Sequence, residues 1–148
     1  AVTEAEDNII RDVNMNIQGY DLDADLIRCA MKNAADAGVG EHIHFQARDV
    51  RKLSSSKKYG FIITNPPYGE RLEDKEALPA LYKEMGTVFD ALDTWSKFII
   101  TSYEDAERYI GKKATKNRKI YNGMIKSYYY QYMGPKPGHG FRKSDKEK

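Results

Sequence analysis

A short apolar run that ends at two consecutive prolines constrains the fold of this chain more than any other feature. Residues 59–64 read YGFIIT, and Asn65-Pro66-Pro67-Tyr68 follows them directly. A short, continuous apolar run is consistent with a buried strand of a parallel sheet. Because Pro-Pro continues neither a strand nor a helix, the chain must turn here. The turn is therefore predicted to lie at the carboxyl end of a buried strand.

Predicted strands and helices alternate along most of the chain. Apolar residues at helical or strand spacing predict helices over 3–13, 24–37, 78–92 and 104–110, and strands over 16–20, 42–46, 59–64 and 97–102. Two further strands, 114–121 and 124–133, are joined at Asn122-Gly123, which favours a hairpin. This order predicts an α/β fold whose sheet is mostly parallel and ends in an antiparallel hairpin.

The composition excludes several classes of protein. The 148 residues suit one globular domain, with 41% hydrophobic and 31% charged residues. No apolar run approaches the roughly 18 residues of a membrane span, and the acidic start has no secretory signal. Cys29 is the only cysteine, which excludes a disulfide framework and a cysteine-based zinc site. We expect a cytoplasmic protein with neither membrane contact nor metal.

Charge is distributed unevenly along the chain. Residues 1–111 carry 13 Lys and Arg against 20 Asp and Glu, whereas residues 112–148 carry 11 against 2. Such basic blocks often contact nucleic acid, although a solvated basic tail is the alternative interpretation. The last segment, residues 134–148, is rich in Gly, Pro and Lys and is predicted to be disordered.

Polar residues follow two other predicted strands. Asp21 comes directly after residues 16–20, and a carboxylate there could accept both hydroxyls of a ribose. Its alternative role is a helix N-cap, which Asp23 fills better. Asp49 follows the strand over 42–46 and could accept a hydrogen bond from an adenine amino group, or it could be a surface turn residue. Ligands of such sheets bind at these strand ends.

The Asn65-Pro66-Pro67-Tyr68 turn has the chemistry that methylation of an exocyclic amine needs. The Asn65 side-chain oxygen and the Pro66 carbonyl could accept the two N–H groups and turn the nitrogen toward a methyl donor. The prolines would hold these acceptors in place. Tyr68 offers a flat face on which an extruded base could stack. The alternative is an ordinary turn that contains Pro-Pro.

These residues resemble a known family. TNPPYGERL, preceded by FII, is similar to motif IV of class I S-adenosylmethionine-dependent amino-methyltransferases. The extension Gly69-Glu70-Arg71-Leu72 resembles the ribosomal RNA large-subunit guanine-N2 methyltransferases, a group long labelled N6-adenine-specific DNA methylases. IQGYDLDADLIRCAMKNAADAGV looks like motif II with its helix, and KIYNGMIKSYYYQY looks like the closing hairpin. The resemblance covers roughly residues 10–133.

The resemblance implies a Rossmann-like fold, S-adenosylmethionine as the cofactor and direct methyl transfer to guanine N2 of 23S ribosomal RNA without a metal. An upstream RNA-binding THUMP domain is usual in the family. N6-adenine DNA methylation, protein glutamine methylation and a non-catalytic nucleic-acid-binding module remain alternatives. The implied site residues are Asp21 for the ribose, Leu22, Asp49 and Val50 for the adenine, and Asn65, Pro66, Pro67 and Tyr68 for the target amine, with Asn65 also facing the cofactor.

One part of the family pattern has no match in this sequence. The family begins its catalytic domain with a strand and a Gly-rich loop that holds the methionine end of the cofactor. Neither Gly38-Val39-Gly40 nor Gly138-His139-Gly140 follows a strand and opens a helix. We therefore expect residues 1–133 to be the later part of a catalytic domain that lacks motif I. We also expect weak binding of S-adenosylmethionine by these residues alone.

Overall fold

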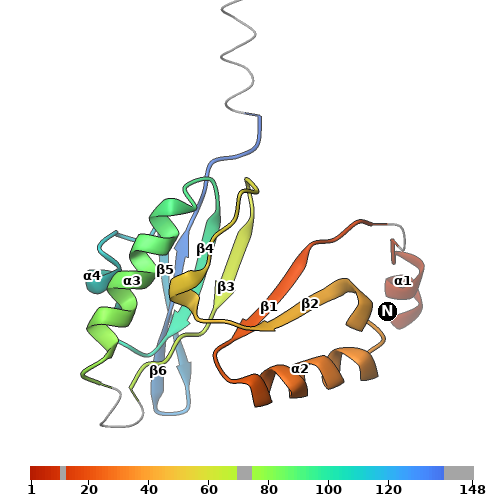
Figure 1. Ribbon diagram of the computed structural model, residues 1–148, viewed down its shortest axis with the longest axis horizontal. Helices are drawn as coiled ribbons and strands as arrows, with labels where there is room; N and C mark the ends of the chain where they lie inside the picture. Colours follow the sequence, from red (N-terminus) through yellow and green to blue (C-terminus); the bar gives the residue numbers. More distant parts are fainter. Residues whose placement is uncertain (11–12, 70–74, 139–148) are drawn as a thin grey trace, which may run out of the picture. The chain divides into compact units, whose positions relative to one another are not determined.

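The computed structural model describes residues 1–10, 13–69 and 75–138. The chain divides into two compact units, Ala1–Val50 and Arg51–Lys148, and each is described by itself (Figure 1). In the described ranges, no helix is both long and apolar enough to cross a bilayer.

The first unit is a parallel pair of strands with one long helix. It contains helix α1 (Val2–Asp7), strand β1 (Ile17–Asp21), helix α2 (Ala24–Asp36), the 3₁₀ turn η1 (Gly40–His42) and strand β2 (Ile43–Ala47). β1 and β2 pair in parallel, from Ile17 opposite Ile43 to Asp21 opposite Ala47. Helix α2 joins the two strands and buries Ile27 and Ala34. The unit therefore has the β-α-β order that the sequence predicted.

Helix α1 is shorter than the predicted helix over 3–13. It ends at Asp7, and the next residue, Asn8, has φ −89° and ψ 1°. The Asn8 side-chain amide donates a hydrogen bond of 2.9 Å to the Glu4 carbonyl. Asparagine side chains compete in this way with continuation of a helix. Of the predicted helix, residues 11–12 lie outside the described ranges.

The second unit is a four-stranded sheet with two helices. After the turn η2 (Val50–Lys52) come strand β3 (Phe61–Thr64), helix α3 (Leu78–Ala91), strand β4 (Ser96–Thr101), helix α4 (Ala106–Ile110), and strands β5 (Lys116–Asn122) and β6 (Ile125–Tyr132). The strand order is β3-β4-β6-β5. β3 and β4 are parallel, and both pairs that involve β6 are antiparallel. The α/β class with a closing antiparallel hairpin is therefore confirmed.

The core of the second unit lies between α3 and the sheet. Six apolar residues of α3 and its C-terminal end are buried: Leu78, Tyr82, Met85, Val88, Phe89 and Leu92. Ile62, Ile99, Tyr130 and Tyr132 on the strands complete this core. Figure 1 shows α3 running along one side of the sheet. Because α3 packs against the sheet here, one of its residues also contacts the turn that follows β3.

Two strand ends differ from the prediction for local backbone reasons. Strand β3 begins at Phe61 and not at Tyr59, because Tyr59 has a left-handed φ of 61° that no strand residue adopts. The hairpin turn is Gly123-Met124 and not Asn122-Gly123, since Asn122 still pairs with Ile125. Among the four turn residues only Gly123 has a positive φ, at 63°. This pattern is that of a type II′ turn, which places Gly at its first central position.

Candidate active site

The carboxyl ends of β1 and β2 bring Asp21 and Asp49 to the same edge of the first sheet. Asp21 is the last residue of β1 and lies opposite Ala47. The Arg48 amide donates to the Asp21 carbonyl at 2.8 Å, which extends the pairing by one residue. Asp49 follows immediately, at the point where the chain enters η2. Parallel pairing thus places both predicted cofactor carboxylates at neighbouring strand ends.

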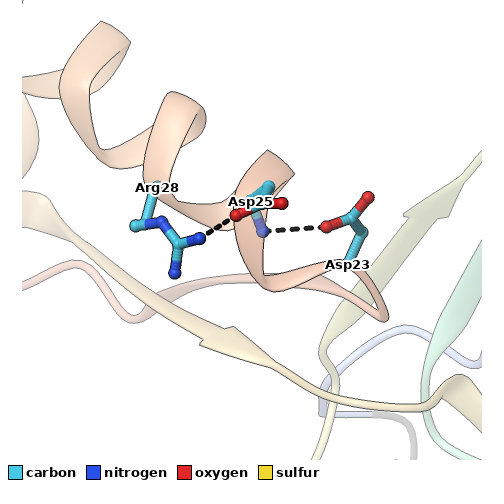
Figure 2. Close-up of polar contacts among 3 residues, drawn as sticks. All are labelled: Asp23, Asp25 and Arg28. Atoms are coloured by element: carbon cyan, nitrogen blue, oxygen red, sulfur yellow. Dashed lines mark hydrogen bonds and ion pairs between the residues drawn. The ribbon is translucent and has the colours of Figure 1, made fainter.

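Asp23, and not Asp21, caps helix α2. The Asp23 carboxylate accepts a hydrogen bond of 2.8 Å from the Asp25 amide, and Asp25 forms an ion pair with Arg28 (Figure 2). Asp21 Oδ1 accepts from the Asp23 amide at 2.8 Å. Within the described residues, Asp21 Oδ2 accepts no hydrogen bond. One carboxylate oxygen of Asp21 is therefore available to a ligand.

The other predicted cofactor residues of this unit differ in exposure. Leu22 is 74% exposed, so its side chain is not part of the core. Asp49 and Val50 are half-buried. The Arg48 guanidinium lies 5.6 Å from the centre of the Tyr20 ring, at the same strand ends. An exposed leucine beside a carboxylate with an available oxygen fits a nucleoside, whose apolar base needs a cover and whose ribose needs an acceptor.

The Asn65-Pro66-Pro67-Tyr68 turn lies in the second unit, directly after β3. Asn65 is exposed, as its predicted role in holding a substrate requires, whereas Pro66 is buried. Pro67 is exposed and Tyr68 is half-buried. In this turn the Asn65 amide is therefore exposed to solvent, whereas Pro66 packs into the protein. Its continuation, residues 70–74, lies outside the described ranges.

Tyr82 of helix α3 is a site residue that sequence reasoning missed. Its sequence position predicts only a place in the helix over 78–92, and it is fully buried. Its hydroxyl donates a hydrogen bond of 2.8 Å to the Pro67 carbonyl and lies 2.7 Å from Thr101 Oγ1. Burial raises the pKa of Tyr82 to about 12, so the phenol is protonated at neutral pH. The only sequence signal was that a buried tyrosine hydroxyl needs a partner.

Strand β5 carries three residues of the basic segment 112–148. Lys116, Arg118 and Lys119 are all exposed. Among the described residues, no group of three or more His, Cys, Asp or Glu side chains could hold a metal ion. The described part of the chain thus presents an exposed amide, two carboxylates at strand ends and a basic strand.

Comparison with known proteins identifies relatives along nearly the whole chain. The family model described as RMKL-like, methyltransferase domain matches residues 1–131. The chain is 44% identical over 129 residues to the "Putative RNA methyltransferase YpsC" of Bacillus subtilis strain 168. The matched residues cover 87% of this chain and 34% of YpsC. It is 38% identical over 122 residues to the "Ribosomal RNA large subunit methyltransferase K/L" of Psychromonas ingrahamii, which covers 80% and 16% of the two chains.

A solved structure has the same fold. SMU.472, described as "a putative methyltransferase complexed with SAH", is 40% identical to this chain with a TM-score of 0.84, over 90% of this chain and 36% of that chain. This chain spans about a third of the length of YpsC and of SMU.472.

Proposed function

Since this chain belongs to the RMKL-like methyltransferase domain family, we propose that it takes part in methyl transfer from S-adenosylmethionine to an exocyclic amine of a nucleic-acid base. The observation that carries the proposal is the turn after β3. Asn65 is exposed there, whereas Pro66 is buried and the Pro67 carbonyl accepts a hydrogen bond from Tyr82. A rigid turn with an exposed amide is suited to orienting a planar NH₂ group.

The chemistry of the turn follows from its acceptors. In an exocyclic amine the nitrogen lone pair is conjugated with the ring and is a poor nucleophile. Hydrogen bonds from the two N–H groups to Asn65 Oδ1 and the Pro66 carbonyl would hold that nitrogen with its lone pair facing the methyl donor. Tyr68 would support the ring of the base by stacking. Electrostatic preorganisation of this kind needs no covalent enzyme intermediate.

The cofactor residues belong to the strand ends of the first unit. Asp21 Oδ2 would accept from the ribose hydroxyls, and Leu22, Asp49 and Val50 would surround the adenine. When bound there, S-adenosylmethionine would supply an electrophilic methyl group to the amine nitrogen and leave as the neutral thioether. The amine then loses one proton to solvent. The complex of the related SMU.472 with SAH supports this choice of cofactor.

For the substrate we propose guanine N2 of 23S ribosomal RNA, bound with the help of an upstream THUMP-like domain. The names of the two relatives, an RNA methyltransferase and a ribosomal RNA methyltransferase, support RNA. The exposed Lys116, Arg118 and Lys119 support contact with a phosphate backbone. The turn itself presents acceptors to any planar amine, so it does not distinguish guanine N2 from adenine N6.

The test is methyl transfer from radiolabelled S-adenosylmethionine, measured on the protein purified at its natural full length. Ribosomal RNA, DNA and a protein substrate are offered separately, and the modified base is identified after digestion. We expect label in RNA as N2-methylguanine. Asn65→Ala should lower kcat by about 100-fold or more, with little change in melting temperature because Asn65 is exposed.

Asn33→Ala is the matched control, since Asn33 is also exposed but lies on helix α2. It should leave kcat unchanged. Label in adenine N6 of DNA would replace the proposed substrate with the alternative one. An Asn65→Ala variant that keeps full activity would contradict the proposed role of the turn and favour a non-catalytic binding module.

A further inference from the structure

The hydroxyl of Tyr82 joins the Asn65–Tyr68 turn to the sheet. Tyr82 is fully buried on α3, and Thr101, at the end of β4, is 1% exposed. Tyr82 Oη lies 2.8 Å from the Pro67 carbonyl oxygen and 2.7 Å from Thr101 Oγ1. Thr101 Oγ1 in turn accepts from the Tyr103 amide at 3.1 Å. A continuous chain of hydrogen bonds therefore runs from the end of β4 to the turn.

Only one assignment of donors and acceptors satisfies every group in this series of hydrogen bonds. The Pro67 carbonyl can only accept, so it takes the single proton of the Tyr82 hydroxyl. The Thr101 hydroxyl must then donate its proton to Tyr82 Oη, and its oxygen accepts from the Tyr103 amide, which can only donate. Because the phenol is protonated at neutral pH, Tyr82 holds the Pro67 carbonyl throughout the ordinary working range.

Between the nitrogen of Pro66 and the nitrogen of Tyr68, the backbone has one soft torsion, which this hydrogen bond sets. The rings fix φ of Pro66 and Pro67 near about −65°. Asn65 and Pro66 each precede a proline, which restricts ψ of both residues to extended values. The peptide bonds are planar. The ψ of Pro67 is left, and it decides both where the Pro67 carbonyl points and in which direction Tyr68 leaves the turn.

We infer that Tyr82 is a positioning residue, which acts through the Pro67 carbonyl to set the direction of Tyr68 relative to the acceptors of Asn65 and Pro66. This inference rests on the proposed function, because the roles of Asn65, Pro66 and Tyr68 belong to that proposal. It assigns Tyr82 no contact with substrate. The competing explanation is that Tyr82 fills the core and its hydroxyl has merely found an acceptor. That explanation predicts a loss of stability alone when the hydroxyl is removed.

The first test measures the backbone of the turn without any substrate. Tyr82→Phe removes only the hydroxyl, and Tyr121→Phe makes the same change at a tyrosine that is 68% exposed on β5. In ¹⁵N relaxation of the full chain, the order parameters of the Tyr68 and Gly69 amides should fall from about 0.85 toward 0.6 in Tyr82→Phe. Those of α3 and β4 should stay at their parent values. Unchanged order parameters at Tyr68 and Gly69 overturn the inference.

The second test separates positioning from packing. Tyr82→Phe should lower kcat by roughly three- to tenfold while the KM for S-adenosylmethionine stays within about twofold, and Tyr121→Phe should change neither. A lower melting temperature with an unchanged kcat would assign Tyr82 a packing role. If the parent protein transfers no methyl group, the proposed function fails, and the order parameters still decide the role of Tyr82.

A second variant covers the case in which Tyr82→Phe does not fold. Thr101→Val removes the hydroxyl that donates to Tyr82 Oη but keeps the bond from Tyr82 to Pro67. It should lower the order parameters of Tyr68 and Gly69 by a smaller amount than Tyr82→Phe does. Order parameters equal to those of the parent in this variant would count against the inference.

Discussion

At the scale of single residues, Asp21 and Asp23 show how two similar carboxylates acquire different roles. Asp23 accepts the Asp25 amide and begins helix α2, whereas Asp21 ends strand β1 and uses only Oδ1 within the described residues. The sequence predicted this division, because an N-cap is decided by its position one residue before a helix. The proposed role of Asn65 in holding a substrate requires an exposed side chain, and Asn65 is exposed.

Asp21→Asn tests the proposed ribose contact. The amide oxygen can still accept from the Asp23 amide, but the negative charge and the second acceptor oxygen are lost. We expect the Kd of the full-length protein for S-adenosylhomocysteine to rise about tenfold, measured by isothermal titration calorimetry, with an unchanged melting temperature. Asp23→Ala is the control, since it should cost about 1 kcal/mol of stability and leave the Kd unchanged. Parent affinity in Asp21→Asn would disprove the ribose role.

At the scale of elements, helices α3 and α4 meet at Gly86. A Cβ atom at this position would lie 2.3 Å from the Ile110 carbonyl oxygen of α4. An alanine in a helix interior normally stabilises by about 1 kcal/mol relative to glycine. Here the close backbone contact leaves no room for a side chain, so the glycine decides how closely the two helices approach.

Gly86→Ala should therefore destabilise the protein by about 1–3 kcal/mol, as expected for overpacking a dense core. The measurement is the free energy of unfolding in urea. Thr87→Ala, at the exposed neighbouring position, should be neutral or slightly stabilising because alanine is the better helix former. A Gly86→Ala variant more stable than the parent would show that α4 moves away readily.

At the scale of the whole molecule, buried tyrosines link the fold to pH. Burial raises the pKa of Tyr82 and of Tyr130 from the ordinary value of 10.0 to about 12, and it raises the pKa of Tyr132 as well. In the unfolded chain these phenols ionise near pH 10, whereas in the folded chain they keep their protons. The folded state therefore binds more protons above pH 10, and the free energy of unfolding must fall as pH rises from about 10 to 12.

We expect the urea midpoint to be insensitive to these groups below pH 9 and to decline above pH 10. For Tyr82 alone the loss approaches about 2–3 kcal/mol at pH 12. Tyr82→Phe should make the decline shallower, and Tyr121→Phe, at an exposed position, should follow the parent. A midpoint that stays constant up to pH 12 would contradict the raised pKa values.

The burial of Lys97 was decided by contacts between distant parts of the chain. Lys97 was predicted as the first residue of an apolar strand, and it is 7% exposed in β4 opposite Tyr132 of β6. Burial and the nearby Lys112 lower its pKa. Tyr132 and Lys112 are remote from Lys97 in sequence, so local spacing contained no information about them.

By itself, the sequence determined the elements, the N-cap, the turn after β3 and the resemblance to a methyltransferase family. These features depend on residues within a few positions of each other, where side-chain periodicity and proline geometry act. Only the tertiary structure decided that β4 pairs with β6 and that Tyr82 reaches the Pro67 carbonyl. Such contacts form only when the folded core brings remote residues to hydrogen-bonding distance, and no local pattern specifies that distance.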